Sequence, residues 1–329
     1  MERQICYGEE LMMRRIPKWA AISLIVVGGI GLALNFSDLK ISGAQIDRTA
    51  AIAPDHIQQA GSSAASSAVV VDSAAVKGTD RLQEIRKRWE FKSGALKNLS
   101  LSSVDNVHIE VKTDTTTDYV ELRGVVSEEA AERATSAVGE SDGLALDLTG
   151  STKFSLLSIG STQHDVYMTL GLRDAKQLEK ADFLLGSGAG DFDDFYARQL
   201  QVDLSSGELT ANRLSGDQIS LDLTSGRVEV KDLIGESQIE LSSGMVQIDG
   251  LEGNSVIKAT SGMVDLTQKT SGNLDVEISS GKADIRAAKD FKGVYDLHVT
   301  SGLVQAPESP GTSGDTIKVR ATSGIITIK

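Results

Sequence analysis

In the C-terminal half of the chain, apolar and polar residues alternate in short runs, which is the pattern of β-strands with one buried face. In residues 218–223 (QISLDL), Ser220 and Asp222 are expected to face water. The apolar residues that alternate with them are expected to face a core. The residues predicted to face inward are Ile219, Leu221, Leu223, Ile239, Leu241, Val246, Ile248, Val264, Leu266, Leu274, Val276, Ile278, Leu297, Val299, Ile317 and Val319. Their predicted outward partners include Glu240, Gln247, Asp265, Asp275, Glu277, Asp296, His298 and Lys318.

A tripeptide of the form Ser/Thr-Ser-Gly punctuates these runs at nearly constant spacing. It ends at Gly207, Gly226, Gly244, Gly262, Gly281, Gly302 and Gly324, so successive copies lie 19, 18, 18, 19, 21 and 22 residues apart. A degenerate copy, Gly186-Ser187-Gly188, extends the series upstream. A second glycine falls near the middle of most repeats, at Gly216, Gly235, Gly253, Gly272, Gly293 and Gly314. Each repeat therefore divides into two lengths suited to a short strand.

This repeat predicts an all-β fold, a repetitive β-solenoid or β-helix with coils of about 19 residues. Stacked coils would pair equivalent strands and align the inward residues into a continuous core. Glycine at the turn permits positive φ, and the preceding Ser or Thr could bond the turn backbone and form a ladder of hydroxyls. A nucleophilic role for these serines would need an activating base. The four histidines, His56, His108, His164 and His298, are scattered and supply none.

These motifs resemble a bacterial family of β-strand-repeat proteins that are called adhesins without a defined ligand. The resemblance rests on units such as LTSGRVEV (residues 223–230) and LSSGMVQI (residues 241–248), and it spans residues 105–329. It implies an N-terminal membrane segment, a tether and a C-terminal solenoid, with an association with envelope-stress systems of Gram-positive bacteria. The family brings no catalytic residues to carry over.

Two segments near the solenoid have helical spacing. In residues 79–92, Leu82, Ile85 and Trp89 predict a short amphipathic helix, which forms part of an entry region at residues 81–104. This helix could lie on a membrane surface or cap the neighbouring domain. Residues 125–143 depart from the repeat and predict a helical insertion of about 12 residues before or beside the first coils.

An uncharged apolar segment near the N-terminus predicts a transmembrane helix. It covers residues 19–36, and Arg14, Arg15 and Lys18 precede it. By the positive-inside rule, residues 1–18 are cytoplasmic and the chain after residue 36 is extracytoplasmic, with the protein held in the cell membrane by a single span. Cleavage as a signal peptide is the alternative. Residues 37–80 are rich in Ser and Ala and predict a flexible tether.

Composition limits the possible binding partners and the kind of core. The net charge of −13 argues against nucleic acid, because binding phosphates requires a basic surface. Aromatic residues make up 4% of the chain, which favours a thin repetitive core over a thick globule. The single cysteine, Cys6, precludes an intrachain disulfide, and cysteine avoidance is typical of an exported protein.

The densest carboxylate cluster is Asp191, Asp193 and Asp194, which could attract a hard cation such as calcium. The glycine-aspartate repeat of calcium-binding β-rolls is absent from the sequence, so Asp193 and Asp194 are expected in an exposed loop without metal. The same carboxylates could serve glycoside hydrolysis, but the repeats contain few aromatic residues for sugar binding. Nucleotide-binding and zinc motifs are also absent from the sequence. We therefore expect no catalytic, cofactor-binding or metal-binding residues.

The sequence ends on ATSGIITIK, with no polar cap after the last strand. We expect this C-terminal coil to expose its edge and three residues, Ile325, Ile326 and Ile328, and to support self-association or pairing with an envelope protein.

The sequence thus predicts a membrane-anchored extracytoplasmic solenoid that acts in adhesion, scaffolding or envelope stress without catalysis. An envelope protein or a glycan is the expected partner. Two alternatives are a β-helical enzyme acting on polysaccharides and a sensor subunit of an envelope-stress system.

Overall fold

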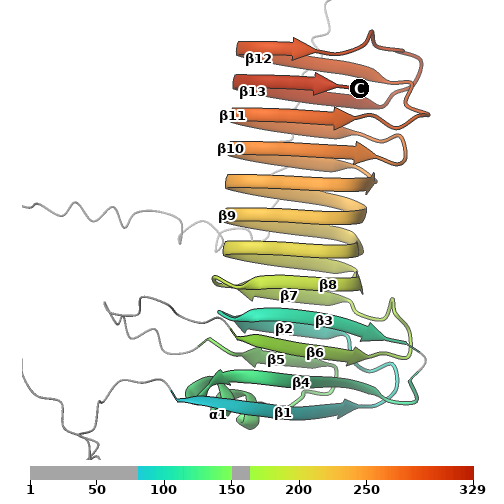
Figure 1. Ribbon diagram of the computed structural model, residues 1–329. Helices are drawn as coiled ribbons and strands as arrows, with labels where there is room; N and C mark the ends of the chain where they lie inside the picture. The colour runs from blue at the N-terminus through green and yellow to red at the C-terminus, as the bar shows by residue number, and fades with distance from the viewer. Residues whose placement is uncertain (1–80, 114, 150–163) are drawn as a thin grey trace, which may run out of the picture. The chain divides into compact units, whose positions relative to one another are not determined.

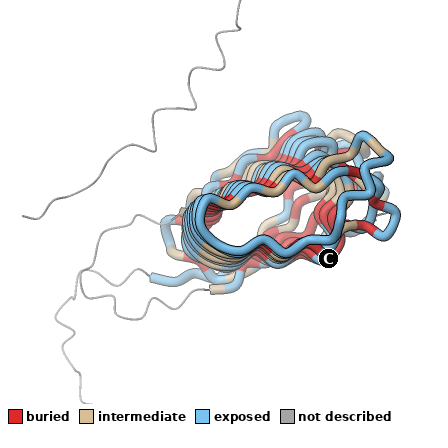
Figure 2. The backbone as a smooth tube through the Cα atoms, turned by 90° about the horizontal axis from the view of Figure 1, so that it is seen from above, coloured by how far each residue is buried: buried red, intermediate tan, exposed pale blue. Residues whose placement is uncertain are grey.

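The computed structural model describes residues 81–113, 115–149 and 164–329. Its C-terminal part is a stack of flattened coils that form two opposed sheets (Figure 1), and the view along the stack shows the closed outline of each coil (Figure 2). We call the sheet built from the first half of each coil the first face, and the other sheet the second face. The strand β9 (Gln199–Glu252) winds through several coils without a break.

Equivalent strands in adjacent coils pair in parallel and in register, as the repeat predicts. Ser261 of β10 lies opposite Ser243 of β9 and Ser280 of β11. The remaining coils are β10 (Ser255–Gln268), β11 (Leu274–Arg286), β12 (Val294–Gln305) and β13 (Thr316–Ile328). The solenoid-like all-β architecture is therefore confirmed for this part of the chain.

The inward residues predicted from alternation form the core. Those of the inner coils are buried, and Leu221, Ile239, Val276 and Val319 are fully inaccessible to solvent. Leu297 and Val299 are only half-buried, because they belong to β12, the last layer of the stack. The core is made mainly of aliphatic side chains, apart from a group of three phenylalanines near its first coils: Phe183, Phe192 and Phe195.

The repeated glycines stack into a ladder. Gly226 and Gly244 have φ of 140° and 132°, a left-handed region that disfavours other residues. A Cβ at Gly244 would also overlap the carbonyl oxygen of Gly226 in the coil beneath. Turn geometry, expected from the sequence, is therefore one of two reasons for glycine, and close backbone stacking is the other.

The predicted alignment of the motif serines is confirmed, since Ser261 lies opposite Ser243 and Ser280 in the adjacent coils. The second serine of every motif is exposed, and within the described residues these side chains form no hydrogen-bonded ladder. They stand at the outer surface of the corner, where water can satisfy them. The serines concerned are Ser206, Ser225, Ser243, Ser261, Ser280, Ser301 and Ser323.

The first coils are not stacked in chain order. The coil of β2 and β3 lies between a later coil, β5 and β6, and the next one, β7 and β8. The bounds are β2 (Asn98–Ser103), β3 (Asn106–Lys112), β5 (Gly143–Asp147), β6 (Asp165–Gly171), β7 (Lys180–Leu185) and β8 (Ala189–Tyr196).

The last coils are also exchanged, which corrects the expectation for the chain end. The C-terminal strand β13 lies between β11 and β12, with Ile317 opposite both Leu274 and Tyr295 (Figure 1). Ile326 and Ile328 are therefore buried, and of the three predicted isoleucines only Ile325 is exposed. After β11 the chain passes over one layer to form β12, and then returns so that β13 fills the layer between them. The open end of the stack is therefore β12.

The predicted helix at residues 79–92 is also wrong. The segment forms β1 (Leu82–Phe91), antiparallel to β4 (Asp118–Ser127), which is antiparallel to β6. Ile85 and Trp89 are buried as expected, but a spacing of four satisfies the strand period of two as well as the helix period. Leu82 is exposed and Phe91 is buried, and only the strand period explains both.

The helix predicted within residues 125–143 is confirmed as α1 (Glu128–Ser136), which packs on β1, β4 and β5. Ser127 caps its first turn by accepting a hydrogen bond from the Ala130 amide. At the other end, Lys87 Nζ donates to the carbonyl oxygens of Thr135 and Ala137 at 2.6 and 2.7 Å. The Ala137 amide also caps this end by donating to the carbonyl oxygens of Arg133 and Ala134. A cation at a helix C-terminus is favourable, so Lys87 of β1 adds to this capping.

The predicted cytoplasmic segment, transmembrane anchor and tether, residues 1–18, 19–36 and 37–80, lie outside the described residues. Within the described ranges, no helix has the length and apolar character needed to cross a bilayer.

We predict that Gly244→Ala lowers the stability of the stack by about 3 kcal/mol, because it combines a disfavoured φ with a backbone clash. Urea unfolding followed by circular dichroism measures the change. Gly314→Ala is the matched control, since a Cβ there meets nothing within 4 Å, and it should stay within about 0.5 kcal/mol of the parent protein. Equal effects of the two substitutions would contradict the ladder.

Replacing Lys87 with Met should lower the unfolding free energy by about 1 to 2 kcal/mol, because the C-terminal carbonyls of α1 lose their charged donor. Arg86→Met is the control, since the Arg86 side chain is 77% exposed. Urea unfolding measures both variants. If the Arg86 variant were as destabilised as the Lys87 variant, the role of Lys87 in capping α1 would be rejected.

Candidate functional site

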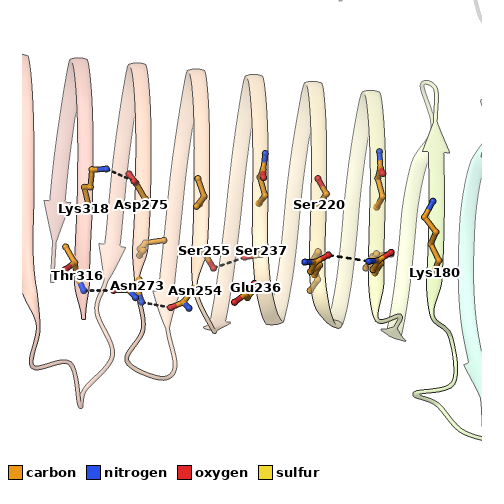
Figure 3. A pocket seen from close by; sticks show the side chains of 18 of the residues that line it. Lys180, Ser220, Glu236, Ser237, Asn254, Ser255, Asn273, Asp275, Thr316 and Lys318 are labelled. Atoms are coloured by element: carbon orange, nitrogen blue, oxygen red, sulfur yellow. Dashed lines mark hydrogen bonds and ion pairs between the residues drawn. The ribbon is translucent and has the colours of Figure 1, made fainter. Parts of the chain in front are cut away.

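A groove of about 820 Å³ runs along the outer surface of the first face, across strands from β7 to β13 (Figure 3). In each coil, the residues just before and just after one inward-facing residue point outward. The residues before it form the first wall of the groove, and those after it form the second. The first wall comprises Lys180, Gln199, Gln218, Glu236, Asn254, Asn273 and Thr316. The second wall comprises Asp182, Gln201, Ser220, Gln238, Val256, Asp275 and Lys318. With strands about 4.8 Å apart, the groove is roughly 29 Å long.

Side-chain amides tie the coils together along the first wall. Asn254 Oδ1 accepts a hydrogen bond from the Asn273 amide, and Asn273 Oδ1 accepts one from the Thr316 amide, both at 3.0 Å. Gln199 Nε2 donates to Gln218 Oε1 at 3.5 Å. Four of the seven residues of this wall are therefore amides, and the solenoid fixes their spacing.

The second wall is oriented by a row of carboxylates beside it. Gln201 Nε2 donates to Asp203 at 3.0 Å, and Gln238 Nε2 donates to Glu240 at the same distance. Between them, Ser220 Oγ donates to the carboxylate of Asp222 at 3.3 Å. We call Asp203, Asp222 and Glu240 the acidic row. Because it holds the glutamine N–H groups, the amide oxygens can accept hydrogen bonds from a ligand.

The acidic row has distinct titration properties along its length. Burial and the neighbouring carboxylates, Asp203 first among them, raise the pKa of Asp222 above its ordinary value. The hydrogen bond from Lys258 holds the pKa of Glu240 below its ordinary value. Asp222 is thus the member of the row whose ionisation the structure opposes.

Charges in the groove are paired near its two ends. Lys180 contacts Asp182 at 2.5 Å. Lys318 contacts Asp275 at 2.6 Å, and Figure 3 shows this second pair. Between these pairs the walls consist of amides and hydroxyls, with Val256 and one carboxylate, Glu236. The centre of the groove is therefore mostly uncharged.

Two serines interrupt the apolar residues of the groove floor. Ser237 and Ser255 occupy the register position held by Leu274 in the next coil, and both are buried. Their hydroxyls are 2.7 Å apart and form a hydrogen bond (Figure 3). The pair satisfies its own polar atoms, so the cost of burying hydroxyls in the core is reduced.

The predicted carboxylate cluster does not converge. Asp191, Asp193 and Asp194 are exposed on β8, a strand instead of the expected loop. Each bonds a residue of the next coil, and the partners are Thr210, Asn212 and Arg213. Within the described residues, no group of three or more His, Cys, Asp or Glu side chains could hold a metal ion.

The histidines are distributed over separate places. His108 lies between Asp165 and Asp191, at 3.5 and 3.2 Å, and stacks on Tyr167. His164 lies beside Asp105, and burial raises the pKa of that carboxyl. His298 is exposed on β12, and His56 is outside the described residues. The rings of His108 and His164 thus contact aspartates and a tyrosine instead of the serines of the repeat.

The groove was missed by the sequence analysis. Its residues are chemically ordinary one at a time, and only the register of the coils brings them into columns. A signal was present, because glutamine, asparagine or serine stands on at least one side of the first inward position in five successive repeats, from Gln199 to Asn273.

Comparisons with known proteins show which protein family and which solved structures this architecture is similar to. The Toastrack DUF4097 family model matches residues 96–329. No curated protein matches the chain. The solved structure of a "putative adhesin" from Bacteroides fragilis is 13% identical, with 76% of this chain and 98% of that one covered and a TM-score of 0.38. A "putative cell adhesion protein" from Clostridium sporogenes is also 13% identical, with 75% and 99% covered and a TM-score of 0.23.

We predict that Asp222→Asn raises the melting temperature at neutral pH. The raised pKa of Asp222 means that its ionisation costs stability, and this cost disappears as the pH falls below that pKa. The gain should therefore shrink on acidification. Thermal denaturation across a pH series measures it, with the exposed Asp290→Asn as control. A loss of stability at neutral pH would contradict the assignment.

Proposed function

Because this chain belongs to the Toastrack DUF4097 family, we propose that it is a non-catalytic, adhesin-like binding module that holds a neutral polysaccharide in the groove of the first face. We further propose that residues 19–36 anchor it in the membrane and that the solenoid is displayed outside the cytoplasm. The apolar segment and the basic residues before it support this placement.

The observation that carries the proposal is the continuity of the groove over successive coils. A polymer with a regular repeat can meet the same kind of wall residue at each step, here an amide or a hydroxyl. Sugar hydroxyls both donate and accept hydrogen bonds, as these side chains do. Many weak contacts along one chain give useful affinity without a single strong site.

Charge favours a neutral polymer over an anionic one. The lysines in the groove are already paired with aspartates, and the acidic row lies directly beside the second wall. A polyanion would meet the negative charge of the acidic row, in which Glu240 alone is paired with a lysine, Lys258, among the described residues. The net charge of −13 would oppose its approach as well.

The groove carboxylates also support binding without hydrolysis. Glycoside hydrolysis commonly uses two carboxyl groups about 5 to 9.5 Å apart. Asp182 and Asp275 lie in register five layers apart, which is roughly 24 Å at ordinary strand spacing. Both are held in ion pairs, and Glu236 is the other carboxylate that lines the groove. The acidic row has closer spacing, but its carboxylates accept hydrogen bonds from the second wall and do not line the groove.

We predict that Ser220→Arg and Val256→Arg each weaken polysaccharide binding at least about tenfold, because a long side chain would fill the groove and crowd its walls. Binding of the purified full-length chain to dextran, laminarin and mannan can be measured by calorimetry or affinity electrophoresis, with polygalacturonate as the anionic comparison. Gln247→Arg, on the second face, is the control and should bind as the parent does.

Longer chains of the bound polysaccharide should bind more tightly than its short oligosaccharides, since the groove spans several sugar units. Release of new reducing ends during incubation would instead support the enzymatic alternative. Failure to bind any neutral polymer, or binding that is insensitive to both groove substitutions, would reject the proposed function.

A further inference from the structure

The strand β12 is an open edge of the stack. Its Val294 amide donates to the carbonyl oxygen of Asp315, on the side of β13. The next amide, of Tyr295, donates to the hydroxyl of Ser309 on the opposite side. Backbone groups alternate along a strand, so those of Leu297 and Val299 also point away from β13. Among the described residues, no strand pairs with this side of β12.

The open edge exposes apolar surface that inner coils bury. Val319, the neighbour of Leu297 in β13, is fully buried, whereas Leu297 itself is half-buried. Val304 is 41% exposed, although its neighbour in β13, Ile326, is fully buried. A further layer on β12 would bury Leu297 and Val304 and satisfy the free backbone groups.

The opposite end of the stack is closed to such pairing. There the edge strand β1 carries Arg86, Lys87 and Arg88, and α1 packs against β1 and β5. Charged residues on an edge strand are a common means of preventing edge-to-edge association. In contrast, β12 contains no Lys, Arg or Pro, and its register with β13 is uninterrupted.

We propose that β12 pairs antiparallel with β12 of a second copy of this chain, across a two-fold axis at Leu297. Because the other end of each stack has a charged edge strand, this contact closes as a dimer and does not propagate into a filament. The side chains of Asp296 and His298 are complementary, since a carboxylate can accept a hydrogen bond from an imidazole N–H, and this favours a second copy over an unrelated strand. In this arrangement Asp296 lies opposite His298 of the second copy, and the same pair forms again on the other side of the axis.

The pairing is compatible with the side chains already present on this face. Asp296 lies beside Lys318, and His298 lies beside Arg320, so both edge residues already border a basic residue in the next layer. Their side chains point outward, while Leu297 of each copy extends the core. Ser309 competes with the partner strand only for the Tyr295 amide.

Sedimentation velocity of the full-length chain over a concentration series tests the proposal. We expect a reversible dimer whose dissociation constant rises about tenfold in Asp296→His and in His298→Asp, because each change places like residues opposite each other. The double variant exchanges the two residues and should restore the parent dissociation constant. Glu277→His, on the same face but two layers inside the stack, should leave it unchanged.

A monomer at every concentration would overturn the proposal. A dimer whose dissociation constant is the same in both single variants, Asp296→His and His298→Asp, as in the parent would also overturn it, because its contact would then lie elsewhere. Circular dichroism of each variant distinguishes loss of pairing from loss of folding. The result is independent of the groove, so polysaccharide binding by a monomeric chain would separate this failure from that of the proposed function.

Discussion

The close approach of glycine backbones in adjacent coils is the constraint on which the structure depends. Each glycine of the repeat turns the chain at a φ that other residues avoid, and it leaves room for the carbonyl group of the glycine beneath it. With this corner fixed, the strands on both faces are held in register over the whole stack. A solenoid gains its stability from such contacts between neighbours, so a change at one corner is felt in both adjacent layers.

The same register creates the surface on which we base the proposed function. A residue type repeated in successive coils becomes a column, and two polar columns flank one buried position to form the groove. The acidic row is a third column, and it orients the side chains of the second wall. The binding surface is therefore a product of stacking, since no single coil contains more than a few of its residues.

The sequence predicted the parts of the fold that depend on local periodicity. The alternation around Leu221 and Val276 identified the buried face, and the glycine spacing identified the coil. The prediction from the sequence failed for β1, because Ile85 and Trp89 are four residues apart and this spacing fits a strand and a helix equally well. It also failed for the order of layers at both ends, since β12 and β13 have the same pattern and would fit either position. The groove was not predictable for a related reason: Gln218 and Asn254 acquire a common role only when their coils are placed in register.

Neighbours in the stack, and not neighbours in the chain, determine local stability in this solenoid. Amide hydrogen exchange in dilute solution tests it most directly, because β13 ends the sequence but lies inside the stack, whereas β12 is the outer layer. We expect the amides of β13 to exchange more slowly than those of β12. Faster exchange in β13 than in β12 would contradict it.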